Sequence, residues 1–187
     1  TASRQVLSDH AQLGQTIQAL LSQRLVRKVE QQILHGTGAD GEVEGLVTLA
    51  TAYTPTAGAA NLAESIGEAI VDMVVAGFAP NLIVCNPLDW FKVSTLKEAS
   101  TGSYLMGNPA QPIAPSLWNR AVAQSPLLAA GTALVLDTAH ISLLDRQQLQ
   151  VMASEHHSDN FIKNLVTLLA ELRIGLEIRH TGAVRKV

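Results

Sequence analysis

The longest helical pattern of the sequence ends in Val29-Glu30-Gln31-Gln32-Ile33-Leu34-His35-Gly36-Thr37-Gly38. Upstream, Ser8-Asp9 is a typical N-cap, and apolar side chains recur at helical spacing as far as Ile33. Gly36 is a typical helix stop. A continuous helix from Ser8 to His35 is about 42 Å long. Because this length is large for a compact domain, we expect a strut with an apolar stripe along one side.

The rest of the chain predicts an α+β fold, because it contains both helical and strand patterns. Helical spacing predicts helices from Asn61 to about Phe78 and around Leu88 to Ala99. Strand patterns predict a central strand at Leu82–Cys85 and others near Arg120–Gln124, Thr132–Leu136 and Gln148–Ala153. Strict alternation from Ala170 to Arg179 predicts a strand that begins at about Asn164. We also expect a loop at Gly102–Pro115 and an extended piece at Val184–Val187.

The composition leaves two interpretations of the surface open. Apolar residues make up 47% of the chain and charged residues only 16%, whereas an ordinary soluble domain is about 25% charged. Either the chain is a monomer rich in Ala, Leu and Val, or much of its surface is buried against other subunits, since interface cores are depleted in charge. The net charge of −3, without a dense basic run, argues against a dedicated nucleic-acid binder.

The single cysteine and the interrupted apolar stretches argue against a disulfide-linked, a cysteine-based zinc-binding or a membrane-spanning protein. Cys85 cannot form an intrachain disulfide or supply a cysteine-based zinc site, and its apolar surroundings predict an inert buried thiol. The N-terminal residues show no signal segment, and the longer charge-free stretches are interrupted by Thr, Pro and Gly, so we expect no membrane span.

Charge is divided unevenly along the chain. Residues 1–48 and 154–187 together hold nine basic and nine acidic residues, whereas residues 49–153 hold four basic and seven acidic ones. The two ends therefore resemble one unit around an acidic insert, which is the pattern of a discontinuous domain.

Three candidate sites have ordinary structural explanations. Gly36–Gly41 follows a helix and lacks the Lys and Ser/Thr of a phosphate-binding loop, so a turn is the better interpretation. His156-His157 with Asp159 suggests a metal site, but no further ligand lies at useful spacing, so a surface turn is favoured. Composition alone leaves a Ser-His-Asp triad open, although no serine has the context of a nucleophile elbow. We predict no metal site and no cofactor.

Asn164 and Glu171 are polar residues in apolar stretches, where a side chain must find a partner or face an interface. Glu171 and Arg173 lie on the same face of the predicted strand. The ordinary explanation is therefore an ion-pair ladder across strands or between subunits.

Six motifs then occur in a specific order. They are Val29-Glu30-Gln31-Gln32-Ile33-Leu34-His35-Gly36-Thr37-Gly38; Glu44-Gly45-Leu46; Val84-Cys85-Asn86-Pro87-Leu88-Asp89-Trp90; Lys97-Glu98 before Gly102-Ser103-Tyr104-Leu105; Leu117-Trp118-Asn119-Arg120-Ala121-Val122; and Asp159-Asn160-Phe161-Ile162-Lys163-Asn164 with Ala170-Glu171-Leu172-Arg173. This order resembles the major capsid proteins of tailed bacteriophages and prophages, which have the Hong Kong 97-type fold. The resemblance covers essentially the whole chain.

The resemblance implies a peripheral domain, with the long spine helix and a sheet, and an α/β axial domain. We expect residues 1–48 and 154–187 to form the peripheral domain and residues 49–153 the axial domain. It also implies a non-enzymatic structural subunit of the virion capsid that assembles into hexamers and pentamers in the cytoplasm of the bacterial host. Scaffold, protease and portal proteins would be further partners, without sequence-specific nucleic-acid binding or a membrane.

Family members carry an N-terminal arm and an extended loop before the spine helix. Both would precede Thr1, so we expect a truncated core that assembles little or no shell by itself.

In one branch of the family, a Lys on that loop attacks an Asn of a neighbouring subunit, assisted by a Glu from a nearby chain. The resemblance places the acceptor at Asn164 and the assisting carboxylate at Glu171, where it can take the proton that makes the amine nucleophilic. The donor Lys has no assigned position, and relatives that do not crosslink share similar patterns.

Overall fold

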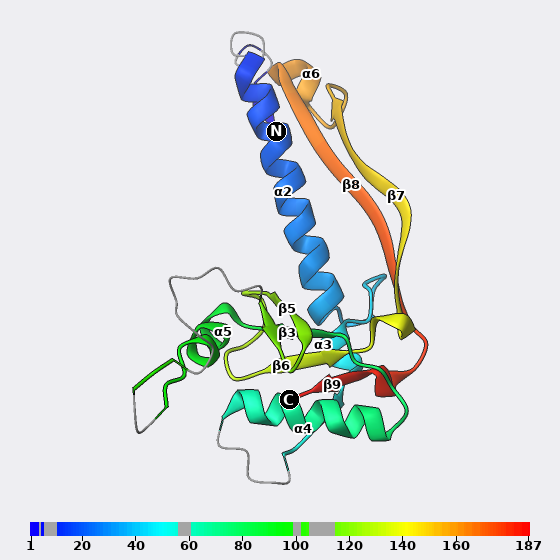
Figure 1. The fold of residues 1–187 in the computed structure, drawn as a ribbon. Helices are drawn as coiled ribbons and strands as arrows, with labels where there is room; N and C mark the ends of the chain where they lie inside the picture. The colour runs from blue at the N-terminus through cyan, green and yellow to red at the C-terminus, as the bar shows by residue number, and fades with distance from the viewer. Residues whose placement is uncertain (4, 6–10, 56–60, 99–101, 105–114) are drawn as a thin grey trace.

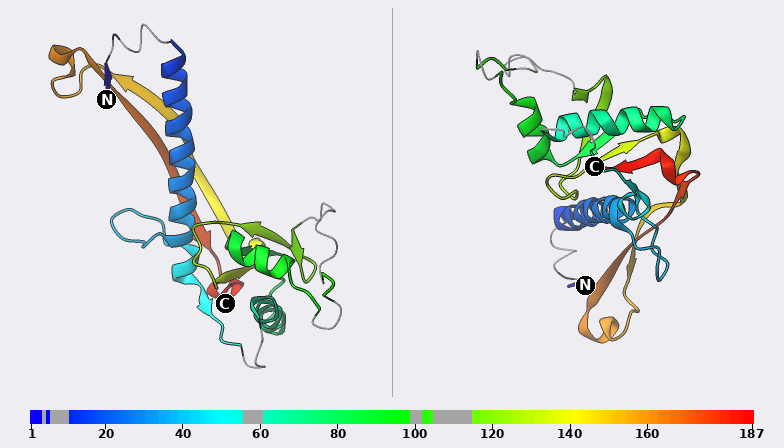
Figure 2. Two further views of the ribbon diagram at one scale, coloured as in Figure 1. Left: turned by 90° about the vertical axis from the view of Figure 1, so that its left-hand side faces the viewer. Right: turned by 90° about the horizontal axis from the view of Figure 1, so that it is seen from below.

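The computed structural model describes residues 1–3, 5, 11–55, 61–98, 102–104 and 115–187, and it consists of an arm and a body (Figure 1). The arm contains helix α2 (Ala11–His35) beside a long hairpin of strands β7 (Ile141–Ser154) and β8 (Leu165–Ile178). The body is a six-stranded sheet with helices on both faces. Figure 2 shows the N-terminus near the tip of the arm and the C-terminus in the body. The α+β fold class predicted from the sequence is confirmed.

Helix α2 ends at His35, as predicted, because the chain reverses tightly at Gly36. The Gly36 N–H bonds the Gln32 carbonyl at 2.9 Å, and Thr37 pairs with Glu44 as the chain returns. A Cβ atom on Gly36 would lie only 1.9 Å from the Val43 carbonyl oxygen, so glycine is required at this approach. The predicted start at Ser8 lies outside the described residues.

The arm hairpin pairs β7 with β8 from Ile141↔Ile178 to Ser154↔Thr167. A short third strand, β1 (Ala2–Ser3), pairs antiparallel with the other edge of β8. The start of β8 agrees with the prediction. Strand β7 begins seven residues before the predicted Gln148, and its register shifts on both sides of Gln147.

The body sheet has the strand order β2-β9-β6-β3-β5-β4. Its strands are β2 (Thr51–Ala52), β9 (Val184–Lys186), β6 (Ala133–Leu136), β3 (Leu82–Cys85), β5 (Arg120–Gln124) and β4 (Ser116–Leu117). Successive side chains alternate between its faces. Ile83 and Val135 point toward α4 (Leu62–Val75) and α5 (Pro87–Ser94), whereas Val84 and Leu134 pack with Leu34 of α2 and with α3 (Leu46–Leu49). The body therefore has two hydrophobic clusters, one on each face of the sheet, and the end of α2 belongs to one of them.

Local signals explain the limits of the body helices. The Asn61 side chain accepts a hydrogen bond from the Glu64 N–H, and Asn86 caps α5 in the same way ahead of Pro87. Helix α4 ends before the predicted Phe78 because Gly77 has a positive φ of 90°. Helix α5 ends at Ser94 rather than Ala99. Most of the predicted loop at Gly102–Pro115 lies outside the described residues.

Sheet pairing crosses the predicted limits between peripheral and axial parts. Strand β7 lies largely inside the predicted axial range, yet it pairs with β8 in the arm. Strand β9 lies in the predicted peripheral range, yet it pairs with β2 and β6 in the body. The chain first enters the body after α2; it then passes to the arm through the 3₁₀ helix Thr138–His140 and returns to the body through the 3₁₀ helix Thr181–Ala183. We therefore propose placing the limits at these three crossings, because residues 49–153 do not coincide with one sheet.

Candidate interaction surfaces

Asn164 lies at the tip of the arm, where α6 (Asn160–Lys163) joins β8. It adopts a left-handed conformation with φ 54° and ψ 46°, and its N–H bonds the Asn160 carbonyl. Asn tolerates this conformation better than most residues. Its side chain is exposed and makes no hydrogen bond with any residue that the structure describes. The tip therefore presents to solvent a carboxamide that has no hydrogen-bond partner among the described residues.

Asn160 holds the tip in place. It is only 3% exposed, and its Nδ2 donates to Thr167 Oγ1 at 2.7 Å and to the Ser154 carbonyl at 3.5 Å. Lys163 and Asp159 form an ion pair on the outer side. The two hydrogen bonds of Asn160 join α6 to both strands of the hairpin. On this short helix Phe161 and Ile162 are 79% and 86% exposed.

Glu171 lies in the middle of β8, half-buried and opposite Gln150. Arg173 lies opposite Gln147. Within the described part of the chain, neither side chain has an ion pair or a hydrogen bond, so the predicted ladder has no partner across the hairpin. At the end of this strand, Arg179 Nε and Glu177 Oε2 form an ion pair at 3.8 Å. An ion-pair ladder between subunits stays a prediction.

The two residues predicted to act in crosslinking are far apart in one chain. Leu165 to Glu171 is a continuous run of β8, and a strand rises about 3.3 Å per residue, so this run alone spans roughly 20 Å. One copy cannot bring Asn164 and Glu171 together. Any joint role requires residues from different copies.

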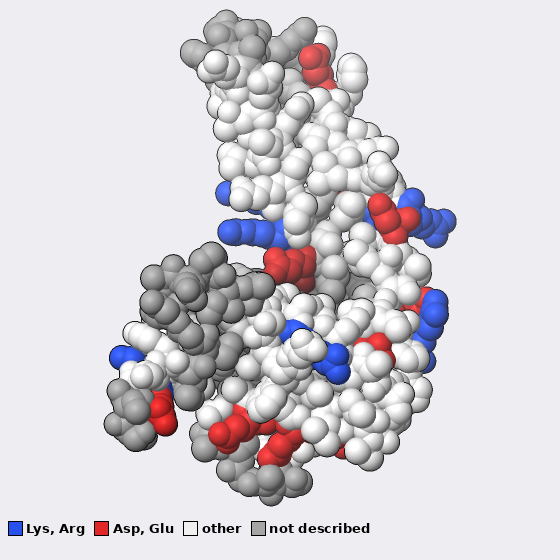
Figure 3. All heavy atoms as spheres, in the orientation of Figure 1, with Lys and Arg blue, Asp and Glu red and all other residues white. Residues whose placement is uncertain are grey.

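Large apolar side chains are exposed on both parts of the molecule. On the arm they are Leu20, Val26, Leu143, Leu144, Met152, Phe161, Ile162 and Leu169; on the body they include Val71, Val74, Val75, Leu88, Phe91 and Trp118. Figure 3 shows few charged side chains over the upper half of the arm. Exposed apolar side chains that lie together on a surface are typical of contacts with another molecule.

The other candidate residues have structural positions. His156 and His157 lie in an exposed turn, as predicted, beside an open hollow of about 680 Å³ that Met152 and Leu169 also line. Among the described residues, no group of three His, Cys, Asp or Glu side chains is placed to hold a metal ion. Burial, and to a smaller extent Asp89, raises the pKa of the buried Cys85 thiol to about 11, so it is protonated at neutral pH. None of the helices that the structure describes is long and apolar enough to cross a membrane.

Comparisons with known proteins agree on one family. The model of the phage capsid family matches residues 1–187. The chain is 36% identical over 189 residues to the major capsid protein of Enterobacteria phage HK97; the match covers 99% of this chain and 49% of that protein, so the chain spans about half the length of this relative.

Solved structures give the same fold at low identity. A capsid of an empty GTA particle has a TM-score of 0.77 at 20% identity, covering 99% of this chain and 69% of that one. A chain from Microbacterium phage Oxtober96 has a TM-score of 0.81 at 14% identity, covering 100% and 69%. From the family match and the identity to the curated relative, we conclude that the chain belongs to the phage capsid family.

Proposed function

We propose that this chain is a structural subunit of a bacteriophage or prophage capsid and that its copies assemble into hexamers and pentamers. Family membership supports this proposal, together with one structural observation. The arm consists of a long helix and a hairpin, and it presents Phe161 and Ile162 at its tip. No described residue buries these two side chains. An exposed apolar tip of this kind suits a closed ring, in which each copy buries the exposed surface of the next copy.

Weak individual contacts are sufficient for such a role. Many contacts per subunit act together in a closed shell, so each one needs only a small free energy. No catalytic group is required. The subunit would reside in the virion capsid and assemble in the host cytoplasm, with scaffold, protease and portal proteins as its expected partners.

Electron microscopy tests the proposal. The protein made from its complete gene should form closed shells or rings with five-fold and six-fold capsomers. A persistent monomer at high concentration, measured by sedimentation, would contradict it.

A second candidate function is autocatalytic crosslinking between subunits. Two observations favour it: the free, exposed carboxamide of Asn164 and the unpaired carboxylate of Glu171 on the described surface of the arm. In this reaction a Lys ε-amine attacks the Asn164 side-chain carbonyl carbon. An isopeptide bond forms, ammonia leaves, and the Glu171 carboxylate of another copy takes the amine proton. The separation of the two residues along β8 is consistent with the involvement of several copies.

A further inference from the structure

The tip of the arm contains a buried polar side chain. Asn160 is 3% exposed, and the other buried polar residues of the described chain all lie in the body: Ser65, Asn86, Asp89, Ser125 and Asp137. Burying a polar group is unfavourable unless it is hydrogen-bonded. At an exposed end of the molecule, the role of Asn160 therefore follows from what its hydrogen bonds hold together.

Asn160 connects three segments of the tip. Its Nδ2 group donates to Thr167 Oγ1 in β8 at 2.7 Å and to the Ser154 carbonyl in β7 at 3.5 Å. Ser154 and Thr167 are the last pair of the hairpin before the turn. The Asn160 carbonyl accepts the N–H of Asn164, whose exposed carboxamide is the predicted crosslink acceptor. One side chain thus ties the position of Asn164 to both strands. We call Ser154, Asn160 and Thr167 the tip clamp.

Other contacts of α6 do not replace the tip clamp. Phe161 and Ile162 are 79% and 86% exposed, so their packing against the hairpin contributes little. The ion pair of Lys163 joins it to Asp159, a neighbour in the sequence, and does not attach α6 to the strands. The described contacts therefore give Asn160 the main role in fixing the tip.

The backbone conformation of Asn164 requires such an anchor. Its left-handed conformation, with φ 54° and ψ 46°, is unfavourable for a residue that has a Cβ atom. Residues keep this conformation where the surrounding structure determines it, and they cluster at functional sites. Because α6 has only four residues, it supplies little of this constraint by itself. The side chain of Asn160 supplies the connection to the hairpin.

We propose that Asn160 is a positioning residue for crosslinking at Asn164, an inference that rests on the second candidate function. An amine attacks an amide efficiently when its nitrogen comes within about 3 to 3.5 Å of the carbonyl carbon in a suitable direction. Without the tip clamp, the carboxamide would sample many positions, and few of them would meet the lysine of another copy. The tip clamp holds the backbone of Asn164 in one conformation before the lysine arrives.

Asn160 acts through position and forms no bond with the reacting atoms. Its side-chain NH₂ group has two donors, and Thr167 Oγ1 and the Ser154 carbonyl engage both, so neither is left for the reacting carbonyl. In the reaction, the lysine nitrogen bonds the side-chain carbonyl carbon of Asn164, and the bond from this carbon to the amide nitrogen breaks. Glu171 of another copy carries the proton from the amine to the leaving nitrogen, which departs as ammonia.

The rate of crosslinking inside assembled shells tests the inference. Shells are made from the complete gene, and the covalent ladder is followed over time on denaturing gels. Thr167→Val keeps the shape of the side chain and removes the hydroxyl that accepts from Asn160, so the rate constant should fall about fivefold, as for one lost hydrogen bond. Thr167→Ser keeps the hydroxyl and should retain most of the rate. Asn160→Ala removes both bonds and should slow the reaction at least about tenfold.

Three further measurements separate positioning from a general loss of stability. Tyr53→Phe removes the 3.3 Å hydrogen bond from Tyr53 Oη to Glu68 in the body, and it should leave the rate unchanged. The pH profile of the rate should keep its shape in Thr167→Val, because the tip clamp transfers no proton. Hydrogen exchange at the Asn164 N–H should become faster in the same variant.

An unchanged rate in intact Thr167→Val and Asn160→Ala shells would overturn the inference, as would an equal loss of rate in Thr167→Ser or a pH profile of different shape. If neither variant assembled, the tip clamp would serve assembly and not the reaction, which also contradicts the inference. Unmodified shells without any ladder would instead contradict the crosslinking function itself, so the two failures are distinct.

Discussion

Ser125 Oγ donates a 2.7 Å hydrogen bond to Glu30 Oε1 and thereby connects the body to helix α2 of the arm. Ser125 is buried and Glu30 is half-buried. Five residues further along α2, His35 Nε2 donates to the Leu127 carbonyl at 2.9 Å. These contacts fix the angle between arm and body, which a shell subunit needs in order to meet its neighbours at defined positions.

We expect Ser125→Ala to lower the free energy of unfolding by about 1 to 3 kcal/mol, because a hydrogen bond to a charged group is lost and no other described residue donates to Glu30. Thermal unfolding, followed by circular dichroism, measures the change. Ser116→Ala is the matched control, since Ser116 is exposed and makes no side-chain hydrogen bond with the described residues. Equal stability of both variants would contradict the assignment.

Gly36→Ala and Gly14→Ala should change stability in opposite directions. A Cβ atom at Gly36 would meet the Val43 carbonyl oxygen at 1.9 Å and the Gln32 carbonyl oxygen at 2.7 Å, so we expect a loss of about 1 to 3 kcal/mol or more. Gly14 lies inside α2 with nothing within 4 Å of the added atom, so alanine should stabilise by about 0.5 to 1 kcal/mol. Urea unfolding of the two variants checks both signs.

The turn after α2 should weaken in acid because of Glu42. Hydrogen bonds from Thr37 and Gln32 hold the pKa of the Glu42 carboxyl below its ordinary value of 4.5. Since the folded-state pKa is the lower one, the stabilisation is complete above the ordinary pKa and is lost as the pH falls through the lowered pKa. Hydrogen exchange at Thr37 N–H, normalised for intrinsic rates, should show weaker protection across that range. Protection that is equally pH-dependent in Glu42→Gln would contradict this cause.

The sequence predicts the parts of the fold that depend on local pattern. The limits of β3 and β5 and the end of α2 follow from apolar runs and from Gly36. The first half of β7 could not be predicted, because Ile141–Asp145 does not alternate and forms a strand only through its pairing with the distant β8. The sheet membership of β9 also depends on distant residues, those of β2 and β6.

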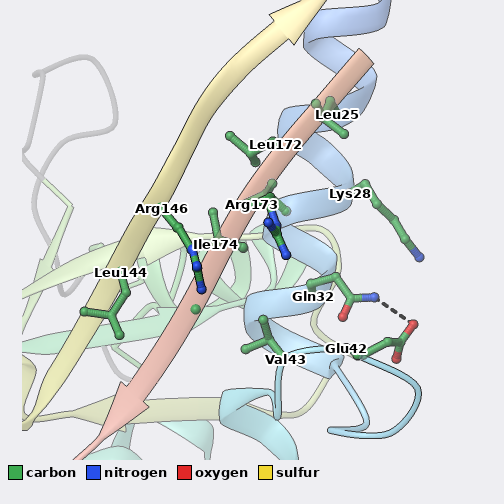
Figure 4. Close-up of a pocket in the computed structure, with 13 residues that line it drawn as sticks. Leu25, Lys28, Gln32, Glu42, Val43, Leu144, Arg146, Leu172, Arg173 and Ile174 are labelled. Carbon is green, nitrogen blue, oxygen red and sulfur yellow. Dashed lines mark hydrogen bonds between the residues drawn. The ribbon is translucent and has the colours of Figure 1, made fainter. Parts of the chain in front are cut away.

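In the candidate site, too, local patterns could be predicted from the sequence, whereas features that depend on distant residues could not. The apolar surroundings of Asn164 and Glu171 marked both residues, but the left-handed conformation of Asn164 and the glutamine opposite Glu171 depend on the fold. The cavity between α2 and the arm hairpin, which Lys28, Arg146 and Arg173 line (Figure 4), gave no signal in the sequence. Its cations come from α2, β7 and β8, and the position of Arg146 depends on a bulge that no periodicity predicts.

The tip of the arm should matter for assembly more than for stability. Phe161 and Ile162 are 79% and 86% exposed, so replacing both by Ser should change the free energy of unfolding by no more than about 0.5 kcal/mol each. Shell yield from the complete gene, measured by sedimentation and microscopy, should fall strongly. His157→Ser, in the neighbouring exposed turn, serves as a control for the loss of an exposed side chain. Normal shells from the double variant would show that the tip is not part of an interface between subunits.

Crosslinking makes the sharpest prediction about Asn164 and Glu171. If assembled particles are crosslinked, a denaturing gel should show covalent ladders. Asn164→Asp should abolish them, because a carboxylate is a poor acceptor for an amine, and Glu171→Ala should abolish them because the proton acceptor is lost. Both residues lie on the arm without side-chain partners in the described chain, so both variants should still form shells.

Mixed particles then separate the two roles. Because about 20 Å of β8 lies between the residues, a single copy cannot supply both to one bond. Particles assembled from equal amounts of the Asn164→Asp and Glu171→Ala proteins should therefore recover part of the ladder, since each copy supplies the residue that its neighbour lacks. A ladder unchanged in the single variants would exclude these two residues from the reaction, and a mixture that stays uncrosslinked would show that one copy must carry both.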